Sequence, residues 1–346
     1  MSPADGTAHD YVLSDALNVL RAGAGETKQV IGVLLELEKD LKALLISNDI
    51  GAARKAEARK VLKEADEAIS AYYRRIAGEL DESGVAEAVT RATVKALEAA
   101  TGKAADTLSP DYLDSLVSNV LIEGAPSKDW WHTQGDDLAF KFGNQVRQGL
   151  ANAETTAQIV QRVVGKRSVG GIMDTARRNA ESLVRTSVQT VAGDARLATF
   201  RKNADIVKGM RQVSTLDGRT TLICIAYSNA EWDLEGQPIN GTTLKFNGGP
   251  PRHWGCRSVL VPITKTFAEM GLDIPEAPKG TRASDVGQVQ ADISFDAFLK
   301  RRGKAFQDEV LGPGRADMWR AGTITLRDLV NGNGSPITIS ALKALH

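Results

Sequence analysis

The hydrophobic positions of the first hundred residues recur at the spacing of an α-helix. Successive members are three or four residues apart, which places them on one stripe of each helix. The first stripe comprises Val30, Leu34, Leu37, Leu41 and Leu44. The second, after the polar break SNDIGAARK, comprises Leu62, Ala65, Ile69, Tyr72 and Ile76. The stripes predict long helices that either bury each other in a hairpin or bundle or serve as an oligomerisation arm.

Helical patterns continue to about residue 204. An alanine-rich run covers 85–100, and residues 140–165 have the pattern helix, turn, helix, with Asn152 and Thr155 as candidate caps. A glycine-rich break, KRSVGGI, then precedes a long helix from about Met173 to Ala204. Its buried face is expected to carry apolar residues at helical spacing, namely Val184, Val188, Val191 and Ala195.

The composition changes at about residue 207, where Gly, Thr, Val and Ile become frequent. The segments VKGMRQVST and SVLVPI are typical of strands, DGRT of a tight turn, and the region between them of an irregular loop. Short helices return in the tail, separated by Gly and Pro residues. We therefore expect an α+β protein that is predominantly helical, with a small mixed α/β core.

The same pattern suggests four consecutive regions. They are a helical N-terminal arm or bundle (1–105), a helical connecting region (106–180), the mixed core (181–264) and a helical C-terminal tail (265–346).

The overall charge gives no reason to expect nonspecific binding to nucleic acid or membranes. The chain has 346 residues, with 43 basic and 43 acidic side chains. We see no basic and then apolar leader at the N-terminus, and no apolar run of the roughly 18 residues that a membrane helix needs. One local cluster on the long helix could contact DNA or could form a solvated face. It comprises Arg185, Arg196, Arg201 and Lys202.

The two cysteines, Cys224 and Cys256, both lie near a turn that also contains His253. If the two predicted strands pair, these residues and Asp217 come to one end of a small sheet. Two thiolates, an imidazole and a carboxylate form a reasonable tetrahedral zinc set, and the H-x2-C spacing lets two ligands share one turn. One structural zinc, metal-free packing and a disulfide remain open as alternatives.

A catalytic role is the less favoured interpretation of the same residues. Cys256 and His253 could form a nucleophile and base, with Arg219 or Arg257 stabilising an anion, or a metal could activate water. However, no strand-to-helix turn presents the thiol, and no orienting Asn or Asp is evident. Neither a GxGxxG motif nor a P-loop is present. His132, beside a Trp pair, is interpreted as structural.

Three segments in order resemble the phage Mu F-like minor head proteins, the phage head morphogenesis family. They are VRTSVQTVAGDARLATF (184–200), STLDGRTTLIC (214–224) and GGPPRHWGCRSVLVPI (248–263). The resemblance covers roughly 125–346. The residues that fall on the family motif D-x-R-T…C…PP-x-H-x-x-C-R are Asp217, Arg219, Thr220, Cys224, Pro250, Pro251, His253, Cys256 and Arg257.

Two positions depart from this motif. Thr221 stands where many members have a first cysteine, and Ser258 replaces the second cysteine of C-R-C. The departures leave Cys224, His253 and Cys256, with Asp217 as the nearby replacement. Apart from metal binding, the other motif residues have structural roles, since prolines fix the returning chain and Asp217 can bond its own turn and an arginine.

The resemblance implies a low-copy virion component that supports procapsid assembly and genome packaging or delivery near the portal. Its partners would be the portal protein, the major capsid or scaffold protein and, in one alternative, packaged DNA contacted by an ejected protein. Its location would be the phage head, and the host cytoplasm during assembly. Self-association would involve the N-terminal helices. No enzymatic activity is expected, and a metal- or Cys/His-dependent hydrolase is the other alternative.

Overall fold

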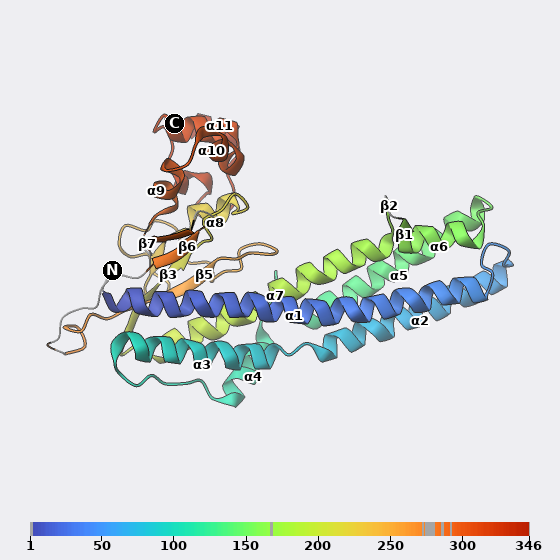
Figure 1. Ribbon diagram of the computed structural model, residues 1–346, viewed down its shortest axis with the longest axis horizontal. Coiled ribbons are helices and arrows are strands. Elements are labelled where there is room, and N and C mark those ends of the chain that lie inside the picture. Colours follow the sequence, from blue (N-terminus) through green and yellow to red (C-terminus); the bar gives the residue numbers. More distant parts are fainter. Residues whose placement is uncertain are drawn as a thin grey trace. The chain divides into compact units, whose positions relative to one another are not determined.

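A computed structural model of the chain describes residues 3–166, 169–271, 273, 281–284, 287–290 and 293–345. It confirms the predicted α+β class, because helices dominate and the strands form small antiparallel sheets (Figure 1). None of the described helices combines the length and apolar content needed to cross a membrane.

In the described part of the chain, all the long helices lie in the first 202 residues, and only short helices and strands follow them. The helices are α1 (Pro3–Ser47), α2 (Lys55–Glu79), α3 (Glu82–Thr101), α4 (Pro110–Asn119), α5 (Ser127–Ala151), α6 (Thr156–Val164), α7 (Ile172–Lys202), α8 (Leu222–Ala226), α9 (Phe295–Lys300), α10 (Lys304–Leu311), α11 (Pro313–Arg320), the 3-10 helix η1 (Leu326–Leu329) and α12 (Ile339–Leu345). The strands are β1 (Gly165–Lys166), β2 (Val169–Gly170), β3 (Val207–Val213), β4 (Glu231–Trp232), β5 (Val259–Thr264), β6 (Thr281–Ser284) and β7 (Gly287–Gln290).

Two compact units divide the chain differently from the four consecutive regions expected. Unit 1 contains residues 1–19, 83–117 and 189–346, and unit 2 contains residues 20–82 and 118–188. Each unit is therefore assembled from segments that are far apart in the sequence. Helices α1, α3, α4 and α7 each contribute residues to both units.

Unit 2 contains long helices whose apolar stripes are buried. The buried positions of α1 are Val30, Val33, Leu34, Leu37, Leu41 and Leu45, and those of α2 are Ala58, Val61, Ala65, Ile69, Tyr73 and Ile76. Helix α2 packs on α5, where the rings of Tyr73 and Trp131 are 6.3 Å apart. A side chain at Gly135 would contact Tyr73, so the glycine permits this close packing. The stripes are thus buried within the chain.

The turns at the ends of two helix pairs contact each other in unit 2. The backbone N–H of Gly51, between α1 and α2, donates to Thr156 Oγ1 at 2.9 Å, and this hydroxyl donates to Asp49 at 2.6 Å. Thr155 caps α6 by accepting a hydrogen bond from Gln158 N, as the sequence predicts. The break in the helical pattern therefore forms a defined turn that packs on a second turn.

Unit 1 contains a three-stranded antiparallel sheet in the order β4-β3-β5. Strands β3 and β5 pair as predicted, with Val213 opposite Val259 and Met210 opposite Pro262. Alternate residues of β5 face different clusters, since Leu260 joins the large core whereas Val259 and Val261 pack with residues of α1 and α3. Both faces of the sheet are therefore covered.

The basic cluster predicted on α7 is not a continuous exposed face. Arg196 is buried, with its side chain 3% exposed, and it donates to Asp15 at 2.9 Å. Arg201 is exposed and donates to the Leu234 carbonyl, and Arg185 pairs with Glu181 at 2.7 Å. Arg196 is therefore unable to contact DNA, because burial in the core removes it from the surface. The sequence pattern missed this because Asp15 lies far away in the sequence.

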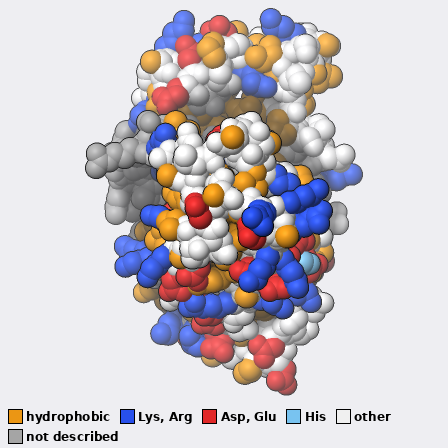
Figure 2. All heavy atoms as spheres, turned by 90° about the vertical axis from the view of Figure 1, so that its right-hand side faces the viewer, with side chains coloured by type: hydrophobic (Ala, Val, Ile, Leu, Met, Phe, Trp, Pro, Cys, Tyr) orange, Lys and Arg blue, Asp and Glu red, His pale blue; other side chains and the backbone are white. Residues whose placement is uncertain are grey.

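Basic and acidic side chains are intermixed on the face shown in Figure 2. Along α2, basic and acidic side chains are also paired at a spacing of four residues, as in Lys60–Glu64 and Lys63–Glu67. This face of the molecule therefore does not present a field of a single sign.

Candidate metal centre

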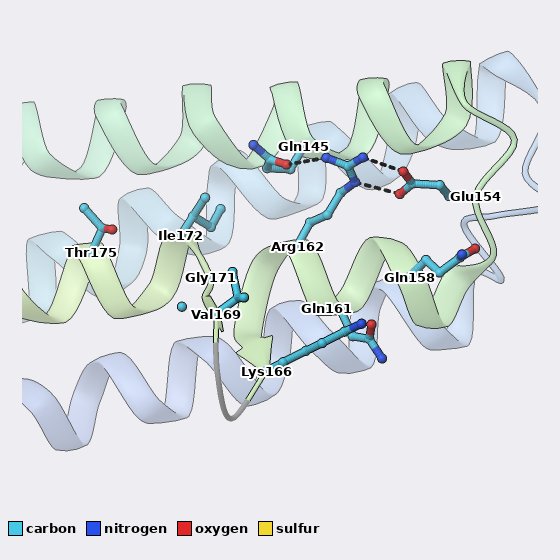
Figure 3. Close-up of a pocket in the computed structure, with 11 residues that line it drawn as sticks. Gln145, Glu154, Gln158, Gln161, Arg162, Lys166, Val169, Gly171, Ile172 and Thr175 are labelled. Atoms are coloured by element: carbon cyan, nitrogen blue, oxygen red, sulfur yellow. Dashed lines mark hydrogen bonds and ion pairs between the residues drawn. The ribbon is translucent and has the colours of Figure 1, made fainter.

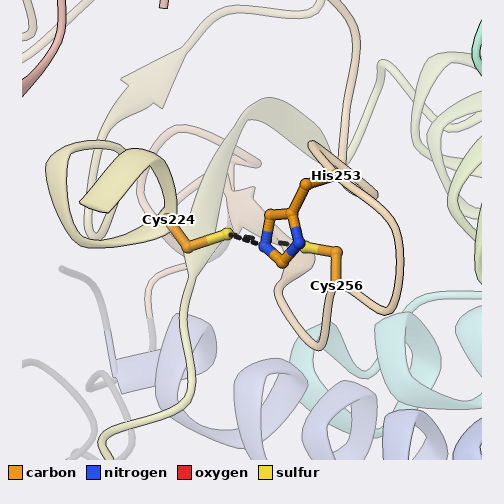
Figure 4. Close-up of side chains that lie close together, drawn as sticks. All are labelled: Cys224, His253 and Cys256. Carbon is orange, nitrogen blue, oxygen red and sulfur yellow. Dashed lines mark hydrogen bonds between the residues drawn. The ribbon is translucent and has the colours of Figure 1, made fainter. Parts of the chain in front are cut away.

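Three side chains with metal-binding atoms meet in unit 1: Cys224 of α8, and His253 and Cys256 of the loop before β5 (Figure 4). Cys224 Sγ lies 3.3 Å from His253 Nε2 and 3.5 Å from Cys256 Sγ. All three potential ligand atoms lie within 4.8 Å of one another. The arrangement can hold a metal ion, as predicted for these three residues.

The local turn places His253 and Cys256 on the same side of the loop. The Cys256 amide donates to the His253 carbonyl at 3.1 Å, and Gly255 takes a φ of 70°, a conformation that favours glycine. His253 Nδ1 lies 3.0 Å from the Trp254 carbonyl. Since a carbonyl only accepts, Nδ1 carries the proton there, and the lone pair of Nε2 is directed at Cys224. The imidazole is therefore oriented as a ligand.

The two buried thiol groups are hydrogen-bonded to each other. A hydrogen bond between the Cys224 and Cys256 thiol groups raises the pKa of Cys224, and burial raises this pKa further. The same contact lowers the pKa of Cys256, and the backbone N–H groups of Arg252 and Ser258 lower it too. Cys256 therefore loses its proton more readily than Cys224, and a thiolate is the form that binds metals.

A layer of hydroxyl groups surrounds Cys224. Thr221 and Ser258 line the same small cavity as Cys224. The Ser258 hydroxyl also donates to Ser214 Oγ at 3.1 Å, which donates to the Cys224 carbonyl at 2.7 Å. The sequence identified positions 221 and 258 only as departures from a motif, and it gave no sign that Ser214 supports the site.

Arg252 braces the loop that carries His253. Its guanidinium stacks 3.6 Å above the Tyr227 ring centroid, and its Nε donates to Gln212 Oε1 at 2.6 Å. The sequence analysis missed this residue, although an arginine directly before His253 was visible in the motif.

Asp217, predicted as a fourth ligand, is not part of the three-residue group. Both of its carboxylate oxygens bind the guanidinium of Arg257, at 2.6 and 2.8 Å, and Asp217 also accepts from Arg219 N at 3.0 Å and from Thr220 Oγ1 at 3.2 Å. These hydrogen bonds lower the pKa of Asp217, with Arg257 as the main cause. The Asp217 carboxylate therefore stabilises the turn through these hydrogen bonds and is not available as a metal ligand. The predicted pairing with arginine and with its own turn is confirmed.

The two prolines of the motif fix the approach of the loop. The Pro250–Pro251 peptide bond is cis. The Pro250 carbonyl lies against Gly193 of α7, where an added Cβ would be 2.6 Å from the carbonyl oxygen. Gly193 therefore lets the loop and the helix approach closely.

A cavity of about 570 Å³ lies in unit 2 between α5, α6 and the β1–β2 hairpin (Figure 3). Its lining combines polar and apolar groups, and its charged groups include Arg162, which donates to Glu154 at 2.6 Å and to Gln145 at 3.1 Å. His132, also in unit 2, is exposed and lies 3.5 Å from Asp136. Among the described residues, neither this cavity nor the surroundings of His132 combine cysteine and histidine side chains as the Cys224 group does.

Comparison of the chain with protein families, with curated proteins and with solved structures finds no match. The geometry of unit 1 and the motif it contains are therefore the basis for any functional conclusion.

Proposed function

We propose that this protein is a minor head protein of a bacteriophage, with a structural zinc ion at Cys224, His253 and Cys256. The convergence of the motif residues is the observation that carries the proposal. The turn 215–220, helix α8 and the loop 248–258 are separated in sequence, yet their motif residues meet at one end of the β3–β5 pair. A resemblance that rests on short segments gains weight when those segments form one structural unit.

The ligand spacing fits zinc. A tetrahedral ion with a Zn–S distance of about 2.3 Å and a Zn–N distance of about 2.0 Å separates two sulfurs by roughly 3.8 Å and a sulfur from a nitrogen by roughly 3.5 Å. The corresponding separations are 3.5 Å between the two sulfurs and 3.3 Å between Cys224 Sγ and His253 Nε2. Thiolate and imidazole are also the ligands that zinc prefers among the common metals.

A structural role suits the place of the ion in the fold. It would connect α8 to the loop 248–258, which lies between β4 and β5 and contains little regular structure. Such segments gain stability when a metal closes them, since ordering the chain costs conformational entropy. Two interactions would thereby stabilise the junction between α8, the turn 215–220 and the loop 248–258, namely the metal ion and the Asp217–Arg257 ion pair.

The size of the adjoining cavity supports this role over catalysis. A cavity of about 20 Å³ lies beside Cys224 and His253. This volume accommodates roughly one water molecule, whereas ligand pockets usually measure about 300–1,000 Å³. Cys256 is 2% exposed, so a substrate has little access to its thiolate. We therefore propose no enzymatic activity.

In the head, we propose that the protein joins the procapsid near the portal and contacts the portal and the capsid or scaffold protein. The apolar stripes of α1 and α2 are buried within unit 2, so these contacts would use other surfaces of the protein. No specific observation favours DNA contact by α7, because Arg196 is buried.

The test uses the phage or prophage that encodes the chain. Its gene is deleted and complemented with the wild type, with His253→Ala, or with His132→Ala as a control outside the metal group. We expect the deletion and His253→Ala to reduce the yield of DNA-filled heads seen by electron microscopy, and His132→Ala to restore it. Mass spectrometry of purified virions should detect the chain at low copy number. Normal heads without the gene, or virions that lack the protein, would refute the proposal.

A further inference from the structure

The three-residue group leaves one position of a tetrahedral ion without a protein ligand. No other His, Cys, Asp or Glu among the described residues joins Cys224, His253 and Cys256. Asp217 is held by two hydrogen bonds to Arg257. Closed structural zinc sites have four protein ligands, whereas three protein ligands leave a position for solvent.

The 20 Å³ cavity lies beside two of the three potential ligands. Cys224 and His253 form part of its wall, and the rest includes the hydroxyl-bearing residues Thr221 and Ser258. These two residues share the cavity wall with Cys224, so they lie close to one of the metal ligands. A cavity that holds one water molecule needs two to four polar partners, and these hydroxyls can provide them.

The charges around the cavity favour an electron-rich occupant. Arg219 and Arg257 both line it. Arg257 is neutralised by Asp217, but the Arg219 side chain is 83% exposed and lies 3.8 Å from that carboxylate. The wall therefore carries hydrogen-bond donors and a positive charge and, within the described part of the chain, no acidic residue.

We propose that the fourth ligand of the zinc ion is a water molecule held in this cavity by Thr221 and Ser258, and that small anions can replace it. The inference rests on the zinc site proposed above. It makes the centre an open site with a bound solvent molecule, in a space too small for larger ligands. A cysteine at position 221 or 258 would place a third sulfur beside Cys224 and close the site.

The first experiment compares the wild type with Thr221→Cys by X-ray absorption at the zinc edge. We expect two sulfur ligands and two nitrogen or oxygen ligands in the wild type, and three sulfur ligands in Thr221→Cys. Zinc should dissociate roughly tenfold or more slowly from the variant, because a thiolate replaces an exchangeable water. Ser258→Cys serves as a second variant if Thr221→Cys does not fold, and Thr221→Ser, which keeps the hydroxyl, is the matched control.

The second experiment replaces zinc with cobalt and adds fluoride, an anion about the size of a water molecule. We expect fluoride to shift the visible spectrum of the wild type and of Thr221→Ser, and to leave that of Thr221→Cys unchanged. An unchanged wild-type spectrum would overturn the inference, because a protein group would then fill the position. Protein that binds no metal would overturn it as well. Head assembly is measured separately by particle counts, so failure here is distinguishable from failure of the proposed head function.

Discussion

The guanidinium of Arg257 donates two hydrogen bonds to the carboxylate of Asp217, at 2.6 and 2.8 Å, across 40 residues of sequence. This two-bond geometry is the strongest that arginine forms with a carboxylate. It connects the turn after β3 to the residue that follows Cys256, so it fixes the corner beside the metal ligands. The pair is partly shielded, since the side chains are 16% and 26% exposed.

Replacing Asp217 with Asn should lower the free energy of unfolding by roughly 1–2 kcal/mol at pH 7, as expected for a partly buried charged hydrogen bond. The folded-state pKa of Asp217 is lowered by Arg257. Its contribution is therefore fully present above the ordinary carboxyl pKa of about 3.9 and disappears as the pH falls through the lower folded value. Urea denaturation of metal-free protein between pH 3 and 7 measures this difference.

The control for this prediction is Arg219→Ala, which removes an exposed arginine from the same turn. We expect a change within about 0.5 kcal/mol. An Asp217→Asn variant as stable as the wild type at pH 7 would contradict a structural role for the pair.

Removal of the metal should destabilise unit 1. We expect about one zinc per chain in the wild type and a large loss of zinc in His253→Ala and Cys256→Ser, because each substitution deletes one of three protein ligands. Chelation should lower the free energy of unfolding by roughly 3 kcal/mol or more when zinc is well above its dissociation constant. Elemental analysis and thermal unfolding measure the two effects. His132→Ala should retain the wild-type zinc content, and an equal loss from it would contradict the assignment.

Arg196→Ala should be among the most destabilising substitutions in α7. It leaves the Asp15 carboxylate buried without its partner, and breaking a buried ion pair in this way costs about 3–5 kcal/mol. Burial already raises the pKa of Asp15, with Arg196 opposing that shift. Chemical denaturation followed by tryptophan fluorescence measures the loss.

Two comparisons make this prediction specific. Arg185→Ala, at an exposed arginine paired with Glu181, should cost less than about 1 kcal/mol. The double replacement Asp15→Leu and Arg196→Met should recover much of the lost stability, since it removes both buried charges. Equal losses of unfolding free energy in Arg185→Ala and Arg196→Ala would show that the buried ion pair contributes no more to stability than the exposed one.

Gly51→Ala should destabilise the contact between the two turns of unit 2. An added Cβ would lie 2.5 Å from the Thr156 backbone nitrogen and 2.9 Å from the Glu154 carbonyl oxygen, so one of the turns must move. We expect a loss of roughly 2 kcal/mol or more. Gly32→Ala, in α1 with nothing within 4 Å, should instead add about 0.5–1 kcal/mol through helix propensity. Thermal unfolding compares the two, and a neutral Gly51→Ala would contradict the contact.

The helices were largely predictable because they depend on local spacing, although α5 begins at Ser127, well before the predicted start at residue 140. The break at SNDIGAARK falls between Ser47 and Lys55, as the two stripes require. The stripes themselves drift by one position at their ends, where Leu45 and Tyr73 are buried in place of Leu44 and Tyr72. A stripe is wider than one residue, so periodicity alone does not select which of two adjacent side chains is buried.

The site was predictable only where its residues are close in sequence. His253 and Cys256 share a turn, so their spacing indicated a common ligand role. The sequence suggested Asp217 as a ligand because it is acidic and nearby, but the competition from Arg257 depends on how the turn and the loop meet in space. The hydroxyl layer of Thr221 and Ser258 needed the structure for the same reason.

The interleaved units have a consequence for synthesis of the chain on the ribosome. Unit 2 has all of its residues once position 188 has emerged. Unit 1 must wait, because Val12 packs with Val259 and Val261 of β5, which are made much later. The first turns of α1 would therefore leave the ribosome long before their partner strand exists. Folding should proceed from the middle of the chain outward, with the corner that contains Cys224, His253 and Cys256 completed near the end.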